Sequence, residues 1–108
     1  MSTTVRLPET DVEGYLVEPL NWTEEVAVEL ARQENIQLME DHWDAIRFMR
    51  EYYMERQIAP DVRHVMKHLA QKHGAESRNK IFELFPYGYV KQACKIAGMK
   101  RPRGWSTG

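Results

Sequence analysis

The stretch Asn21-Trp22-Thr23-Glu24-Glu25-Val26-Ala27 marks the point where the sequence changes from strand-like to helical periodicity. Thr23 is a residue type that caps helices, and the two glutamates after it suit the first turn of a helix. Before this point, short apolar runs around a turn at Glu13-Gly14 predict strands. The sequence therefore predicts a predominantly helical α+β domain, in which a small N-terminal β-meander packs on an array of about five helices.

The helices are predicted from apolar residues that recur every three to four positions. Pro60 is expected at the first position of the third helix, Gly74 at its C-terminal end, and Ser77 as the cap of the fourth helix. Gly98 is expected to end the last helix. The predicted helices cover approximately residues 24–33, 40–56, 60–73, 77–85 and 89–97.

Length and composition favour one globular domain over residues 1–108, with residues 99–108 as a flexible C-terminal arm. The chain has 108 residues, of which 43% are hydrophobic, and a single cysteine, which excludes a disulfide within the chain. The N-terminal residues have no apolar run typical of a signal peptide, and no stretch has the length of a membrane span. We therefore expect a cytoplasmic protein.

The net charge of −1 conceals a strong separation of charge along the chain. Residues 1–44 hold eleven acidic and two basic residues, whereas residues 45–108 hold five acidic and thirteen basic residues. One interpretation is a basic half that attracts an acidic partner or a phosphate backbone. The alternative is that the two halves neutralise each other in the folded protein.

Cys94 lies in the segment Lys91-Gln92-Ala93-Cys94-Lys95-Ile96-Ala97-Gly98. Its spacing from Val90 and Ala97 places it on the apolar stripe of the last predicted helix, where a cysteine acts as a small buried hydrophobe. The neighbouring Lys91 and Lys95 favour the opposite interpretation, because a nearby cation stabilises the reactive thiolate. The residues alone leave both possibilities open.

Other catalytic or metal-binding patterns are weak. His64 and His68 have the spacing that lets two side chains face one metal ion, but no further ligand completes a familiar set. The sequence has no phosphate-binding glycine loop and no nucleophile elbow. We therefore expect no metal and no cofactor.

The third and fourth predicted helices have the proportions of a helix-turn-helix, joined across Gly74-Ala75-Glu76. Arg78 and Lys80 stand near the start of the second of these helices, where a recognition helix contacts bases or phosphates. A weak, salt-sensitive DNA-binding regulator is the alternative function that follows from this pattern.

Several segments resemble the DsrC/TusE family, the small sulfur-carrier proteins that include the gamma subunit of dissimilatory sulfite reductase. The matching segments are Glu13-Gly14-Tyr15-Leu16, Asp41-His42-Trp43, Arg50-Glu51-Tyr52-Tyr53, Gln57-Ile58-Ala59-Pro60, Leu84-Phe85-Pro86-Tyr87-Gly88 and Lys91–Gly98. The resemblance implies a β-meander on helices, a sulfur-metabolism function, and a protein partner such as a sulfite reductase or a sulfur-relay protein.

The resemblance also implies a carrier cysteine on a C-terminal arm, and here the chain departs from the family pattern. Cys94 aligns with the upstream cysteine of some members, whereas Trp105 stands where the arm cysteine is expected, and an indole cannot carry sulfur. Tyr89 stands where a proline is common. We expect a protein that docks on a partner through Lys100, Arg101, Arg103 and Trp105, without independent catalysis. Cys94 is then the candidate persulfide site, and a non-carrier accessory protein is the alternative.

Overall fold

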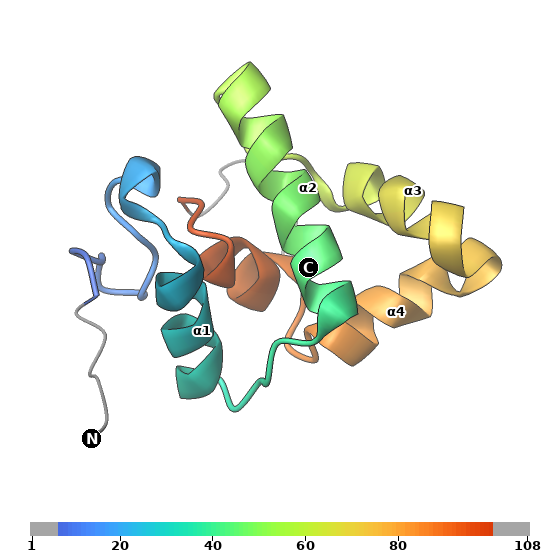
Figure 1. Ribbon diagram of the computed structural model, residues 1–108, viewed down its shortest axis with the longest axis horizontal. Helices are drawn as coiled ribbons and strands as arrows, with labels where there is room; N and C mark the ends of the chain where they lie inside the picture. The colour runs from blue at the N-terminus through green and yellow to red at the C-terminus, as the bar shows by residue number, and fades with distance from the viewer. Residues whose placement is uncertain (1–6, 101–108) are drawn as a thin grey trace.

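The protein was analysed as a computed structural model that describes residues 7–100, and this part of the chain is helical (Figure 1). It contains the helices α1 (Glu24–Gln33), α2 (Glu40–Arg56), α3 (Val62–His73) and α4 (Ser77–Leu84). Two 3-10 turns, η1 (Pro19–Asn21) and η2 (Gly74–Glu76), and the π-helix η3 (Tyr89–Cys94) complete it. No helix within residues 7–100 is long and apolar enough to cross a membrane.

The predicted β-meander, and with it the α+β class, is wrong. Residues 7–18 form a loop whose only strand-like feature is an isolated bridge between Thr10 and Leu16. The Asp11 carboxylate accepts hydrogen bonds from the backbone N–H groups of Glu13 and Tyr15, at 2.9 and 3.0 Å. Because these bonds satisfy the backbone locally, the segment forms a turn instead of a ladder. Val5 and Arg6 of the predicted first strand lie outside the described residues.

α1 and α2 begin and end close to the predicted positions. The Thr23 hydroxyl accepts a hydrogen bond from the Val26 N–H, so Thr23 is the predicted cap of α1. At the start of α2 the N-cap residue is Met39, and the Nδ1 atom of His42 accepts a hydrogen bond of 3.0 Å from the Met39 N–H. The buried face of α2 is formed by His42, Ala45, Ile46 and Met49.

The starts of α3 and α4 differ in detail from the prediction. Asp61 caps α3 by accepting a hydrogen bond from the Arg63 N–H, so the helix begins at Val62 and Pro60 precedes it. Ser77 is the first residue of α4, not its cap. Gly74 ends α3 with a backbone φ of 58°, a conformation that a glycine adopts without strain. α3 and α4 are therefore joined through the short 3-10 turn η2.

The segment of residues 89–100, drawn in dark orange to red in Figure 1, lies between α1 and α2. Hydrogen bonds attach it to both sides: the Trp22 indole donates to the Ile96 carbonyl at 2.9 Å, and the Arg50 guanidinium donates to the Ala97 carbonyl at 3.2 Å. The segment contributes buried side chains to the core that the helices share. Those side chains are Tyr89, Val90, Ala93, Cys94, Ile96, Ala97 and Met99.

Candidate functional site around Cys94

Cys94 is the last residue of η3, and its side chain is fully buried. The helix starts after Gly88, whose φ of 100° turns the chain sharply out of the preceding Phe85–Gly88 turn. The sequence predicts an ordinary α-helix here, whereas the structure has a π-helix over Tyr89–Cys94 that becomes α-helical only at residues 95–96. The apolar stripe did predict that the sulfur is buried.

Burial makes the Cys94 thiol a weak acid. Removal from water raises its pKa to about 12, and a hydrogen bond with Tyr89 acts in the opposite direction. At neutral pH the sulfur is therefore a protonated thiol, and a thiol is not the nucleophilic form.

The two lysines beside Cys94 in the sequence do not activate it. The Lys95 ammonium lies 3.7 Å from the Glu34 carboxylate and 5.4 Å from the centre of the Tyr15 ring. Lys91 is exposed, and both lysines line the same surface pocket. For Lys95 the helical geometry explains this, because consecutive residues of a helix point in different directions.

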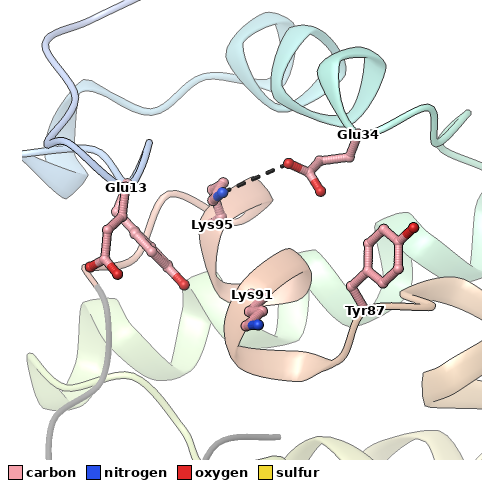
Figure 2. Close-up of a pocket in the computed structure, with 6 residues that line it drawn as sticks. Glu13, Glu34, Tyr87, Lys91 and Lys95 are labelled. Atoms are coloured by element: carbon pink, nitrogen blue, oxygen red, sulfur yellow. Dashed lines mark ion pairs between the residues drawn. The ribbon is translucent and has the colours of Figure 1, made fainter.

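This pocket has a volume of about 570 Å³ and lies between the N-terminal loop, the end of α1 and η3 (Figure 2). Figure 2 shows Lys95 pointing across it towards Glu34. The Gln92 side chain holds Glu34 in place. Its amide donates to the Glu34 carboxylate at 3.0 Å, and its side-chain oxygen accepts from the Tyr87 N–H at 2.9 Å. Carboxylates, ammonium groups and tyrosines together line the pocket: Glu13, Tyr15, Glu34, Tyr87, Lys91 and Lys95.

Tyr89 is a neighbour of Cys94 that the sequence did not reveal. Its ring is buried, its hydroxyl donates to the carbonyl oxygen of Pro60, and the same hydroxyl is a hydrogen-bond partner of Cys94. Residues five apart share one face only in a π-helix, so α-helical spacing does not bring Tyr89 and Cys94 together. The only signal available in the sequence was the departure from the proline that is common in the family at this position.

The two candidate nucleic-acid residues differ in their surroundings. Arg78 is exposed, but the Lys80 ammonium lies 3.1 Å from the Asp41 carboxylate and 3.8 Å from that of Glu83. Asp41 also accepts a hydrogen bond from Lys72 at 3.0 Å. Lys80 thus takes part in an ion-pair cluster that joins α2, α3 and α4.

The histidines on α3 have carboxylate partners of their own. His64 Nδ1 lies 3.3 Å from Asp61, and His68 Nε2 lies 3.1 Å from Asp44. Within residues 7–100, no group of three or more His, Cys, Asp and Glu side chains is arranged to hold a metal ion.

Of the predicted docking arm, the structure describes one residue. Lys100 is exposed and follows directly after the buried Met99. Arg101, Arg103 and Trp105 lie outside the described residues.

Comparison with known proteins gives the family. A family model described as DsrC like protein matches residues 3–105. The chain belongs to this family. The sulfurtransferase TusE of Photorhabdus laumondii is 48% identical over 96 residues, which are 87% of this chain and 86% of the relative. TusE of Escherichia coli is 45% identical over 96 residues, with 87% of this chain and 88% of the relative covered.

Solved structures agree with the DsrC/TusE assignment. The oxidised gamma subunit of dissimilatory sulfite reductase (DsrC) from Archaeoglobus fulgidus superimposes with a TM-score of 0.82 and 36% identity, over 92% of both chains. DsrC of Allochromatium vinosum gives a TM-score of 0.76 and 47% identity, over 89% of this chain and 88% of that one. The prediction of a sulfur-relay family protein is confirmed. None of these relatives supports the DNA-binding alternative.

Proposed function

We propose that this DsrC/TusE protein takes part in sulfur relay through Cys94, and that it does so only when docked on a protein partner. The observation that carries the proposal is the position of the only thiol of the chain. Cys94 lies in the family segment Lys91–Gly98, and Trp105 stands where the arm cysteine of the carriers is expected. Any covalent sulfur carried by a cysteine of this chain must therefore be on Cys94.

The chemical step is a transfer of sulfane sulfur between two cysteines. The Cys94 thiolate attacks the terminal sulfur of a donor persulfide, forming a new S–S bond at the Cys94 sulfur. The S–S bond of the donor breaks, and the donor leaves as a thiolate that takes up the proton released by Cys94. One persulfide is consumed and one is formed, so the step needs no external oxidant or reductant.

The surroundings of Cys94 make this step dependent on a conformational change. A fully buried thiol with a pKa of about 12 neither meets a donor nor supplies the thiolate in the closed protein. Exposure to water removes the desolvation that raises its pKa and provides both the access and the nucleophile. We propose that docking on a partner causes this exposure of Cys94.

Docking is proposed to use the basic C-terminal end of the chain. Lys91 and Lys100 are exposed, and Arg101 and Arg103 follow directly in the sequence. These cations suit an acidic entrance on a sulfite reductase or another relay protein, and Trp105 adds a large apolar anchor. Since Trp105 cannot carry sulfur, the arm would serve for binding and not for transfer.

Incubation with a small-molecule persulfide followed by intact-protein mass spectrometry tests the proposal. We expect the wild-type protein to gain the mass of one sulfur atom slowly when folded and rapidly in mild denaturant. The Cys94→Ser variant should gain none under either condition. A wild-type protein that takes up no sulfur even in denaturant, where Cys94 is accessible, would rule out Cys94 as an acceptor.

A further inference from the structure

The π-helix η3 places the side chains of Tyr89 and Cys94 on the same face. Hydrogen bonds in a π-helix connect residues five apart, which is the separation of these two residues. Both side chains are buried, Tyr89 at 2% exposure and Cys94 at 0%. The pair therefore lies in the interior of the protein, with the phenol hydroxyl next to the sulfur.

The Tyr89 hydroxyl connects this pair to the segment between α2 and α3. It donates a hydrogen bond to the carbonyl oxygen of Pro60, which is also buried. The segment runs from Gln57, in a left-handed conformation with φ of 62°, to Asp61, and it exposes Ile58 to solvent at 61%. Tyr89 thus contacts both Cys94 and the segment of residues 57–61, which connects α2 to α3 at the surface.

A phenol hydroxyl carries one hydrogen and can donate it to only one acceptor at a time. A neutral thiol is a weak acceptor, so the Tyr89 hydroxyl continues to donate its hydrogen bond to the Pro60 carbonyl. An anionic sulfur, in a thiolate or a deprotonated persulfide, is a charged acceptor and forms the stronger hydrogen bond. The charge on Cys94 therefore decides which of the two acceptors Tyr89 serves.

We propose that Tyr89 is a positioning residue that couples the charge on the Cys94 sulfur to the connection between α2 and α3. When the sulfur becomes anionic, the Tyr89 hydroxyl donates to the sulfur instead of to the Pro60 carbonyl. The connection between α2 and α3 then loses its hydrogen bond to η3. The freed connection then keeps the sulfur exposed after docking on a partner has opened the site. This coupling rests on the proposed function, because it assigns a regulator to the same sulfur site.

The groups around Tyr89 keep it in the hydroxyl form that the coupling requires. Burial, Cys94, Asp61 at the start of α3 and Tyr52 on α2 all raise the pKa of Tyr89 above its usual range. Tyr89 therefore keeps its hydrogen while the sulfur titrates. Lys95 is directed to Glu34 and Lys91 to the surface pocket, so the sulfur charge is stabilised by the hydroxyl and not by these cations.

The direct test follows the carbonyl carbon of Pro60 by NMR while the pH is raised from neutrality. In the wild type we expect its chemical shift to change together with that of the Cys94 β-carbon. The Cys94→Ser variant should show no such change, because serine does not ionise. The Ile96 carbonyl, which accepts from the non-ionising Trp22 indole, is the internal reference. A Pro60 signal that stays constant while Cys94 ionises would overturn the proposal.

A second measurement does not require alkaline pH. We expect the Tyr89→Phe variant to be alkylated at Cys94 several-fold faster than the wild type at neutral pH. Phenylalanine has no hydroxyl, so the connection between α2 and α3 lacks its hydrogen bond to η3. The Tyr87→Phe variant is the matched control, because Tyr87 is two residues away and 71% exposed, and its rate should equal that of the wild type. Equal rates for Tyr89→Phe and wild type would also overturn the proposal. Neither measurement uses a sulfur donor, so failure of sulfur loading and failure of the coupling are distinguishable.

Discussion

The Lys95 ammonium pairs with the Glu34 carboxylate at 3.7 Å, across the pocket between α1 and η3. This pairing directs the cation that follows Cys94 in sequence away from the sulfur. It also connects the end of α1 to the helix that carries the thiol. We therefore expect burial, and not Lys95, to govern the reactivity of Cys94.

Alkylation of Cys94 tests this conclusion. Because burial raises the pKa of the thiol from 9.0 to about 12, the thiolate fraction at neutral pH falls by roughly three orders of magnitude. We expect the folded protein to react with iodoacetamide at least about 100-fold more slowly than the protein unfolded in urea. The Lys95→Gln variant should differ from the wild type by less than about twofold. A large loss of rate in this variant would show that Lys95 activates the thiol after all.

Gly98 is expected to tolerate no side chain. Its φ is 79°, and a Cβ atom there would lie 2.8 Å from the Cβ and Cγ atoms of Trp22. The indole cannot withdraw freely, since it donates to Ile96 and packs under the Arg50 guanidinium at 4.6 Å. We expect Gly98→Ala to lower the free energy of unfolding by about 3–4 kcal/mol.

Gly74→Ala is the matched control for this substitution, measured by urea denaturation. Gly74 also has a positive φ, of 58°, but a Cβ atom there meets nothing within 4 Å. Backbone strain alone predicts a loss of roughly 1–2 kcal/mol. Similar losses for the two variants would mean that the contact with Trp22 is not important.

Asp41 is expected to contribute to stability in a defined pH range. Hydrogen bonds from Lys72 and Lys80 lower its pKa from 3.8 to about 2. A carboxylate with a lowered pKa in the folded state stabilises the protein above its unfolded pKa, and this contribution is lost as the pH falls from 3.8 towards 2. We expect Asp41→Asn to cost about 1–2 kcal/mol at neutral pH and to reduce the acid-induced loss of stability. Thermal unfolding against pH measures both effects, and a variant with the wild-type pH profile would contradict them.

Replacement of Trp105 by cysteine tests whether only the carrier group has changed in this chain. We expect the Trp105→Cys variant to gain sulfur at position 105 from a small-molecule persulfide and to exchange it slowly with Cys94, because the buried thiol is only rarely exposed in the undocked protein. Peptide mass spectrometry locates the sulfur, and Ser106→Cys controls for the mere presence of a second thiol near the C-terminal end. A folded variant that takes up sulfur at position 105 but never exchanges it with Cys94 would show that the arm and the thiol no longer meet.

The sequence predicted the helices well because their signals are local. The cap at Thr23, the apolar stripes and Gly74 each depend on residues within one or two turns, and the burial of Cys94 followed from such a stripe. The β-meander failed for an equally local reason, since Asp11 satisfies the backbone that a strand would need to pair.

The π-helix and the role of Tyr89 were beyond the reach of the sequence pattern. The hydrogen bond from Tyr89 to the Pro60 carbonyl joins residues that are 29 positions apart in the sequence. Such a contact depends on how α2 and η3 pack, and no periodicity encodes it. The same holds for the pairing of Lys95 with Glu34, which gave the lysine a partner other than the neighbouring thiol.

The most direct test of the account is mass spectrometry of the protein isolated from its own cells, with thiols trapped at lysis. The account predicts a population in which Cys94 carries one or more additional sulfur atoms, and an increase of that population when the cells metabolise sulfur compounds. Cys94 that is unmodified throughout, in cells where other relay proteins carry persulfides, would contradict a relay function through this residue.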